Sequence, residues 1–299
     1  ESEAICLTKR ITVLLLVVFM VMLAACRSEG AEQSPVPSAS EPPASGSPID
    51  GEPSDTPGTT PEESPVVTGP DYIFADINDN FFEKEYSLEG ANEKITGELY
   101  IAVPEITISE YQENADMINE YFENMKEKYR EGFEYELTLV AEDEELYGHS
   151  ANRFMDLSFS TEYNKDGIVS FMITVVSYQG GAHDNIAIMS ETFDLSNGTR
   201  ITADNLFTVS EEEYTTRIKQ YILAEMDKNV EKGDAMYFDN YHELLDATYD
   251  KEAFVLTEDS LHVYFQVYDL APFAAGLIQF DIPYEYLKDI LNPQYGLIE

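Results

Sequence analysis

The sequence predicts an α+β protein of two small subdomains, each an antiparallel sheet packed with one long amphipathic helix. Three observations support this prediction. Short runs rich in β-branched and aromatic residues follow one another, with turn signals between them. Two long segments instead carry apolar residues at helical spacing. Strands that come in runs, interrupted by only two long helices, differ from the strict strand–helix alternation of parallel α/β folds.

The expected strands alternate apolar and polar residues or form short apolar runs. They cover residues 153–163, 167–178, 185–195, 260–270 and 277–284. The segment 93–106 is expected to form a strand pair ended by Pro104, because proline cannot donate to a sheet ladder. Gly167 closes the turn of one hairpin, and Asn197-Gly198 marks another turn.

Two long helices are expected, over residues 109–131 and 211–231, and a short one after Tyr284. The apolar stripe of the first comprises Met117, Ile118, Tyr121, Phe122, Met125 and Tyr129. Thr107 with Glu110, and Ser210 with Glu213, have the spacing of capping boxes at the two helix starts.

The N-terminus has the pattern of a targeting segment. Two basic residues precede the apolar run 11–23, which is shorter than the roughly 20 residues that a spanning helix needs. The following "LAAC" resembles the lipobox of bacterial lipoproteins, which implies lipid on Cys26 and a position on the outer face of the cytoplasmic membrane. An ordinary signal peptide or an uncleaved anchor is the alternative.

Four regions are therefore expected along the chain. Residues 1–26 are the lipoprotein signal, and residues 27–70, rich in Pro, Ser and Glu, form a disordered linker. Residues 71–183 and 184–299 form the first and second α+β subdomains. The only cysteines, Cys6 and Cys26, precede both subdomains, so packing rather than disulfides must stabilise them.

The chain is strongly acidic, with a formal net charge of −41. Residues 71–299 contain 48 acidic and 14 basic side chains. Such a field repels nucleic acid and phosphate groups and attracts cationic partners. The alternative is that the acidity only confers solubility or reflects a saline habitat.

No catalytic residues, metal site or cofactor are expected. The G-x-S-x-G elbow is absent, and the four histidines lack the close spacing of a zinc site. The acidic clusters 76–80 and 142–145 lack the twelve-residue calcium loop and are interpreted as solvated charge. His183 with Asp184 could hold a metal or shuttle protons, but a polar loop residue is the simpler interpretation.

Three stretches together carry a family resemblance: "SYQGGAHDN" (177–185), "FDLSNGTRITADNLF" (193–207) and "VYFQVYDLAPFAAGLIQFDIPYEYL" (263–287). In this order they resemble the paired exported domains of RsiV-like anti-sigma factors. The same pair of domains precedes the catalytic domain of PdaC-type peptidoglycan deacetylases. The resemblance implies an extracytoplasmic α+β unit and, in the RsiV case, binding of cationic lysozyme. Those anti-sigma factors have a transmembrane helix, whereas this sequence has a lipobox. The resemblance therefore does not imply signalling to a sigma factor.

The sequence thus predicts a non-catalytic binding lipoprotein that recognises a cationic protein, with a lysozyme-type muramidase as the partner. The alternative is a module that binds peptidoglycan or another glycan. The expected contact residues lie in two loops: Tyr178, Gly180, Gly181, His183, Tyr268, Pro272 and Phe273. The competing interpretation is that Tyr268 and Phe273 are core residues and that the glycines serve only geometry.

Overall fold

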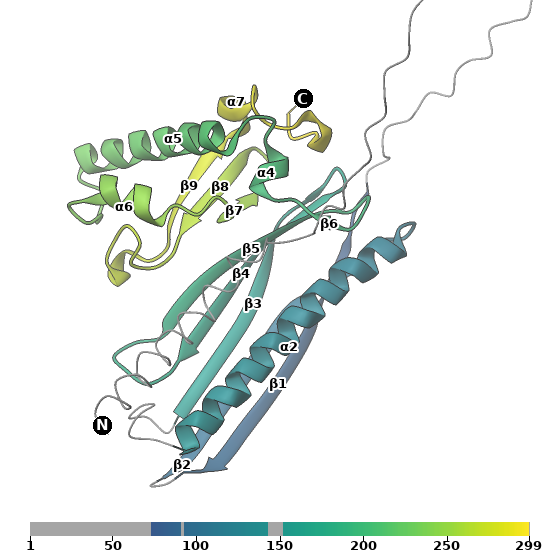
Figure 1. Cartoon of the computed structure of the whole chain (residues 1–299), viewed down its shortest axis with the longest axis vertical. Helices are drawn as coiled ribbons and strands as arrows, with labels where there is room; N and C mark the ends of the chain where they lie inside the picture. The colour runs from purple at the N-terminus through teal and green to yellow at the C-terminus, as the bar shows by residue number, and fades with distance from the viewer. Residues whose placement is uncertain (1–72, 91–92, 143–151, 299) are drawn as a thin grey trace, which may run out of the picture.

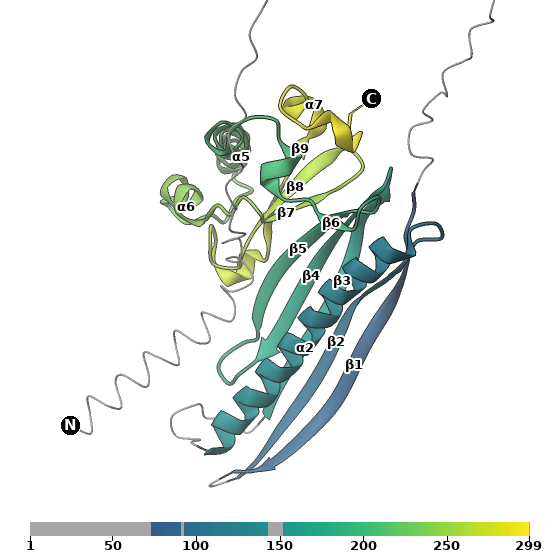
Figure 2. The same cartoon turned by 45° about the vertical axis from the view of Figure 1, so that its right-hand side comes forward.

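The computed structural model describes residues 73–90, 93–142 and 152–298. A six-stranded sheet carries one long helix, α2, along one face (Figure 1). A three-stranded sheet with its own helices lies against one end of the opposite face, next to β4 and β5 (Figures 1 and 2). The predicted α+β class with two sheets is confirmed.

The first subdomain consists of β1 (Asp76–Glu89), β2 (Lys94–Thr107), α2 (Gln112–Glu142), β3 (Asn152–Lys165), β4 (Ile168–Tyr178), β5 (Asn185–Asp194) and β6 (Thr199–Arg200). The second consists of α4 (Ala203–Leu206), α5 (Glu211–Lys232), α6 (Tyr241–Thr248), β7 (Phe254–Leu256), β8 (Ser260–Phe265), η1 (Phe273–Ala275), β9 (Ile278–Pro283), α7 (Tyr284–Leu287) and η2 (Pro293–Tyr295).

The strands of the large sheet lie in chain order, β1 to β6, and those of the small sheet in the order β7-β8-β9. All pairs are antiparallel except β2 and β3, which run parallel because α2 crosses between them. The first sheet is therefore mixed rather than purely antiparallel. β5 lies beyond residue 183, the expected subdomain boundary, and pairs with β4 along its whole length, so the first sheet continues to Arg200.

The strand pair expected over residues 93–106 is wrong: one 14-residue strand, β2, runs through Pro104. Pro104 pairs with Asp79 of β1 on one side. On the other side, the pairing of β2 with β3 stops at Ile101, so the missing N–H of Pro104 interrupts no second ladder. The partner strand β1 includes residues 76–80, an acidic stretch that the sequence did not mark as a strand.

Helix α2 runs 11 residues further than position 131, where the sequence predicted its end. Its apolar stripe continues through Phe133, Leu137 and Val140, which are all buried. Met117, assigned to the stripe, is instead 53% exposed. Lys126 lies on the inner side, where its Nζ donates to Asn80 Oδ1 at 2.7 Å and so ties the helix to β1.

The contact between α2 and β2 is close at Gly97. A Cβ on this residue would lie 2.7 Å from Leu137 Cδ1 and 3.1 Å from Phe133 Cε1. Both neighbours are buried, so neither can move aside without disturbing the core. Glycine at position 97 therefore sets the distance between the helix and the sheet.

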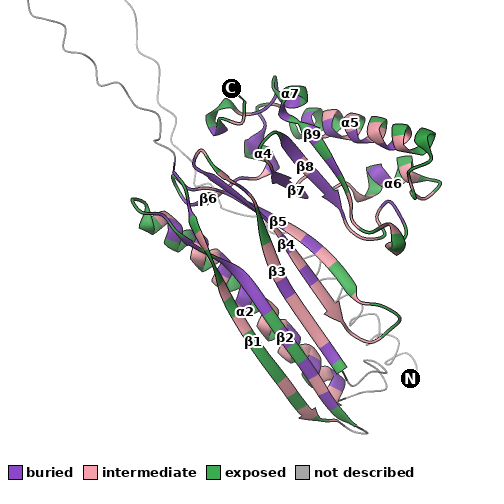
Figure 3. Cartoon of the chain, turned by 180° about the vertical axis from the view of Figure 1, so that it is seen from behind, coloured by how far each residue is buried: buried purple, intermediate pink, exposed green. Residues whose placement is uncertain are grey.

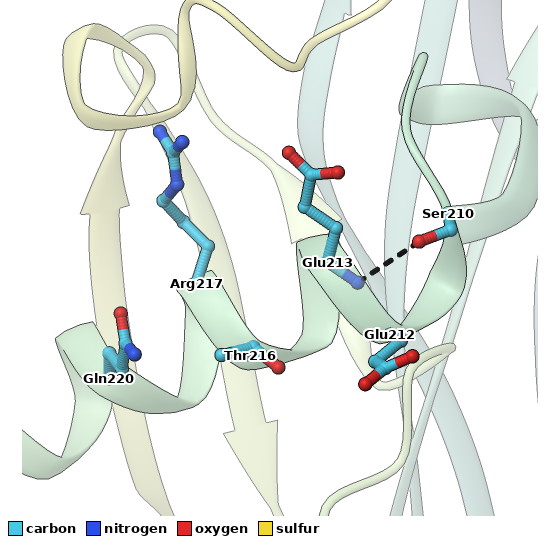
Figure 4. A pocket seen from close by; sticks show the side chains of 6 residues that line it. All are labelled: Ser210, Glu212, Glu213, Thr216, Arg217 and Gln220. Carbon is cyan, nitrogen blue, oxygen red and sulfur yellow. Dashed lines mark hydrogen bonds between the residues drawn. The ribbon is translucent and has the colours of Figure 1, made fainter.

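Helix α5 matches its predicted start and ends one residue beyond its predicted end. The Ser210 hydroxyl accepts a hydrogen bond from the backbone N–H of Glu213 at 3.4 Å (Figure 4). Gly233, with φ of 75°, ends the helix in the left-handed conformation that favours glycine. The capping pair predicted at Thr107 and Glu110 is wrong, because α2 begins later, at Gln112.

The two sheets meet through buried polar groups on the face of β4 and β5 opposite α2. The hydroxyls of Ser170 and Thr192 hydrogen-bond at 2.7 Å, and Leu256 N donates to Ser170 Oγ at 3.1 Å. Tyr264 donates to Ser190 Oγ at 3.0 Å. Each of these bonds satisfies a group that burial would otherwise leave unpaired.

On the α2 side of β5, one buried carboxylate connects helix, strand and hairpin. Glu191 is 7% exposed. Its Oε1 accepts from Tyr121 at 2.5 Å, and its Oε2 lies 2.5 Å from Arg200 Nε. Burial raises the pKa of Glu191 above its usual value of 4.5, because desolvation outweighs the attraction of the partly exposed Arg200.

We expect Gly97→Ala to lower the free energy of unfolding by about 1–3 kcal/mol, since it overpacks the contact with α2. Urea unfolding of the full-length protein measures this change. In a Leu137→Ala background the same substitution should cost much less, because the clashing side chain is shortened. Equal costs in both backgrounds would contradict the close-approach explanation.

We expect the Glu191→Gln variant to gain stability relative to the wild type as the pH rises from 4.5 towards 7. The raised pKa means that the folded state binds this proton more tightly than the unfolded state, so the wild type loses stability across this window. Urea unfolding at several pH values measures the difference. Glu120→Gln, on the exposed side of α2, is the control. A difference that is constant, or that moves towards the wild type, would refute the burial argument.

Candidate functional site

The structure brings together the two loops that the sequence singled out. One loop joins β4 to β5, and the other joins β8 to β9. The ring of His183 stacks on Phe273 with centroids 4.2 Å apart and an interplanar angle of 25°. The Tyr268 hydroxyl lies 3.2 Å from His183 Nε2, although 85 positions separate the two residues. These three side chains are named the aromatic cluster.

The first loop depends on two glycines. Gly180 and Gly181 have φ values of 88° and 138°, which L side chains rarely adopt. A Cβ on Gly181 would meet nothing within 4 Å, so backbone conformation alone accounts for the glycine there. Tyr178 secures the turn: its hydroxyl donates to Gly181 O at 3.3 Å, and its ring stacks on Phe154 with centroids 6.2 Å apart.

The second loop is held by a carboxylate and a short 3-10 turn. Asp269 Oδ2 accepts from Gln266 N at 2.8 Å, and burial raises the pKa of this carboxyl. Pro272 is exposed and precedes η1, which ends at Gly276 with φ of 71°. Tyr268 lies between Gln266 and Asp269, is 54% exposed and has φ of 76°.

An exposed tyrosine in the left-handed region is unusual, because its Cβ crowds the backbone there. Such strain persists only where the surroundings fix the conformation, and it is concentrated at functional positions. Because Tyr268 is exposed, the competing interpretation that it is a core residue is wrong. Phe273 is half-buried, because the His183 ring covers one side of it.

Residues that the sequence did not single out hold the loops in register. The side chain of Gln266 bonds to the backbone of β5 in both directions: Ile188 N donates to Oε1 at 2.9 Å, and Nε2 donates to Ile188 O at 2.7 Å. This amide occupies the place that a neighbouring strand would take. The only sequence signal was a lone glutamine in the apolar run 261–270.

The cluster combines a histidine, a tyrosine hydroxyl and a phenyl ring. His183 Nδ1 lies 2.8 Å from Asp184 O, and its other nitrogen faces the Tyr268 hydroxyl. Within residues 73–90, 93–142 and 152–298, no three His, Cys, Asp or Glu side chains gather as a metal site would require. What the cluster presents to solvent is an aromatic rim on a fixed turn.

Other candidate groups in the described chain lie beside carboxylates of the same subdomain. His262 Nδ1 lies 2.6 Å from Asp281 Oδ1, and His242 Nε2 lies 3.0 Å from Asp227 Oδ1. The open hollow beside the first turns of α5 is lined by Ser210, Glu212, Glu213, Thr216, Arg217 and Gln220 (Figure 4). Its one cation, Arg217, is paired with Asp289 at 2.7 and 3.0 Å.

Several predictions concern residues outside the described ranges. The signal segment 1–26, the lipidation of Cys26, the linker 27–70 and all but the first residue of the acidic cluster 142–145 are among them. Across the parts of the chain that are described, no helix is both long enough and apolar enough to cross a membrane.

The family match lies in the second subdomain. Residues 204–285, from α4 into α7, match the family described as "Protein of unknown function (DUF3298)". A search of curated proteins found no match.

Two crystal structures share the fold. A member of the DUF3298 family from Bacteroides fragilis is 21% identical with a TM-score of 0.56, and the match covers 75% of this chain and 98% of that one. A DUF3298 family protein from Pseudomonas aeruginosa is 14% identical with a TM-score of 0.51, and the match covers 74% and 96%. No RsiV-like or PdaC-type protein is among them, so that finer assignment stays a prediction. Residues 204–285 are thus similar to the DUF3298 family, and the chain shares its fold with DUF3298 proteins of two bacteria.

Proposed function

We propose that the folded part of this chain is a non-catalytic binding domain that recognises a cationic protein, held at the cell surface by lipid on Cys26. The partner class follows from the acidic charge, and the resemblance to RsiV-like ectodomains narrows it to a lysozyme-type muramidase. A single observation supports the proposal most strongly: the aromatic cluster joins two distant loops around an exposed tyrosine on strained backbone.

The position of the cluster suits a tethered receptor. The described chain enters beside the β3–β4 hairpin, where Gly167 N donates to Ile73 O at 3.2 Å and the Asn164 side chain bonds to Ala75. The loop containing His183 begins at the opposite end of β4. Eleven strand residues separate the two ends by about 35 Å. The cluster therefore lies at the end of β4 opposite to residue 73.

The charge of the domain favours capture of a basic partner. Between residues 71 and 299, acidic side chains exceed basic ones by 34. Complementary charge accelerates association and suppresses wrong partners more than it raises affinity. Tyr268 and Phe273 supply the kind of aromatic area that dominates binding energy at interfaces.

We expect the full-length protein in non-ionic detergent to bind hen lysozyme at both low and physiological salt, measured by calorimetry. Binding that disappears at physiological salt would indicate only charge attraction and would contradict the proposal, as would no binding at either salt concentration. Sedimentation with purified peptidoglycan in high salt tests the glycan alternative. Retention there, without lysozyme binding, would favour a glycan-binding module.

We expect Tyr268→Gly to weaken lysozyme binding by about 10-fold or more while leaving the fold intact, since an exposed aromatic anchor is lost. Glycine also relieves the positive φ, so the free energy of unfolding should stay level or rise by up to about 1 kcal/mol. The control is Tyr286→Ala, on the second subdomain away from the cluster. Alanine is used because glycine at this position would destabilise helix α7. A Tyr268→Gly variant that binds normally would remove this residue from the interface.

A further inference from the structure

We propose that the face of the six-stranded sheet turned away from α2 is the main contact surface for the cationic partner and that it recognises arginine side chains. This inference rests on the proposed function and extends it from the loops to a defined face. Figure 3 shows this side of the sheet, with exposed and half-exposed segments on β1 to β5 below the second subdomain.

The register of the strands defines this outer face. Directly paired residues on neighbouring strands point to the same side of a sheet. One row crosses five strands through Glu83, Tyr100, Asp156, Val176 and Ile186. The next row crosses four strands through Glu85, Glu98, Phe154 and Tyr178. Every member of the two rows is exposed or half-exposed.

The two faces of the sheet differ in how their carboxylates are paired. On the α2 side, Lys84 lies 3.1 Å from Glu134, and Arg130 lies 2.9 Å from the same residue. Lys126 and Arg153 likewise pair with glutamates of α2. In the two outer rows no lysine or arginine occurs. The acids there are Glu83, Glu85, Glu98 and Asp156, and none is in an ion pair with a described side chain.

Two of these carboxylates oppose each other directly. Glu85 and Glu98 are cross-strand partners in the antiparallel β1–β2 ladder. Like charges in this position destabilise a sheet by a few tenths of a kcal/mol to about 1 kcal/mol. A basic group from a partner would remove that repulsion. The electrostatic energy of the outer face is therefore lower when positive charge covers it than when it faces solvent.

Aromatic rings lie among the unpaired acids. Tyr100 is 36% exposed and lies directly opposite Glu83 on β1 and Asp156 on β3. Phe154 and Tyr178 stack against each other. A guanidinium can stack on such rings and pair with neighbouring carboxylates through its planar fork, which an ammonium cannot do. The combination therefore selects arginine over lysine.

The outer face continues into the aromatic cluster. Tyr178 ends the second row and begins the loop that carries His183, and Ile186 ends the first row just beyond that loop. A second copy of this chain is a poor occupant, because it would bring one strongly acidic surface against another. A basic protein face that reaches both the rows and the cluster satisfies the charge and the geometry.

The test compares two double variants that remove the same charge. Glu85→Gln/Glu98→Gln alters the outer face, and Glu113→Gln/Glu120→Gln alters exposed acids of α2 on the other side of the sheet. We expect the first variant to bind hen lysozyme about 10-fold more weakly at physiological salt and the second less than about 2-fold, because the sheet separates α2 from the outer face and salt screens distant charges. Equal losses, or no loss in the first variant, would overturn the assignment.

Two further measurements separate this inference from the proposed function. Deca-arginine should bind the wild type more tightly than deca-lysine, and Glu85→Gln/Glu98→Gln should abolish that preference. If deca-arginine behaves in this way while lysozyme does not bind, the outer face is supported and the lysozyme partner fails. If lysozyme binding depends on Tyr268 but not on Glu85 and Glu98, the cluster is supported and the outer face is refuted. Thermal unfolding verifies that each variant is folded.

Discussion

The pair of hydrogen bonds between the Gln266 amide and the backbone of Ile188 is the constraint on which the arrangement of the two loops depends. These bonds fix the end of β8 against β5, so the loop after β8 starts at a defined point beside the loop after β4. That registration places His183 against both Tyr268 and Phe273. A half-buried amide that meets both its donor and its acceptor requirement specifies one geometry, whereas apolar packing alone would tolerate several.

Sequence periodicity identified the elements that bury a regular stripe and missed those that do not. Helix α5 and strands β3 to β5 match their predicted positions closely, because their buried residues follow a helical or alternating pattern. Strand β1 escaped notice because it lies at an edge and carries charge on both sides. The parallel pairing of β2 with β3 is set by the path of α2 across the sheet, which no local pattern encodes.

In the candidate site, too, the sequence predicted some features and missed others. The two glycines and the aromatic residues were visible as turn and loop signals in the sequence. That His183 and Phe273 would touch is a property of the packing between two sheets, and it depends on Gln266, Ser190 and Tyr264. The segregation of charge is also tertiary. Acids on α2 and on β1 look alike in sequence, yet Glu123, Glu127 and Glu134 of α2 have basic partners, whereas Glu83 and Glu85 of β1 are in no ion pair with a described side chain.

The direction of β1 has a mechanical consequence. The described chain enters at residue 73 and runs at once into β1, which is paired with β2 over all 14 of its residues. A pull on the entering segment along the strand axis would slide β1 past β2. Since the ladder bonds lie across that direction, they would bear such a load together rather than open one after another. The first strand of the fold is thus oriented to resist a force that pulls residue 73 away from the far end of the sheet.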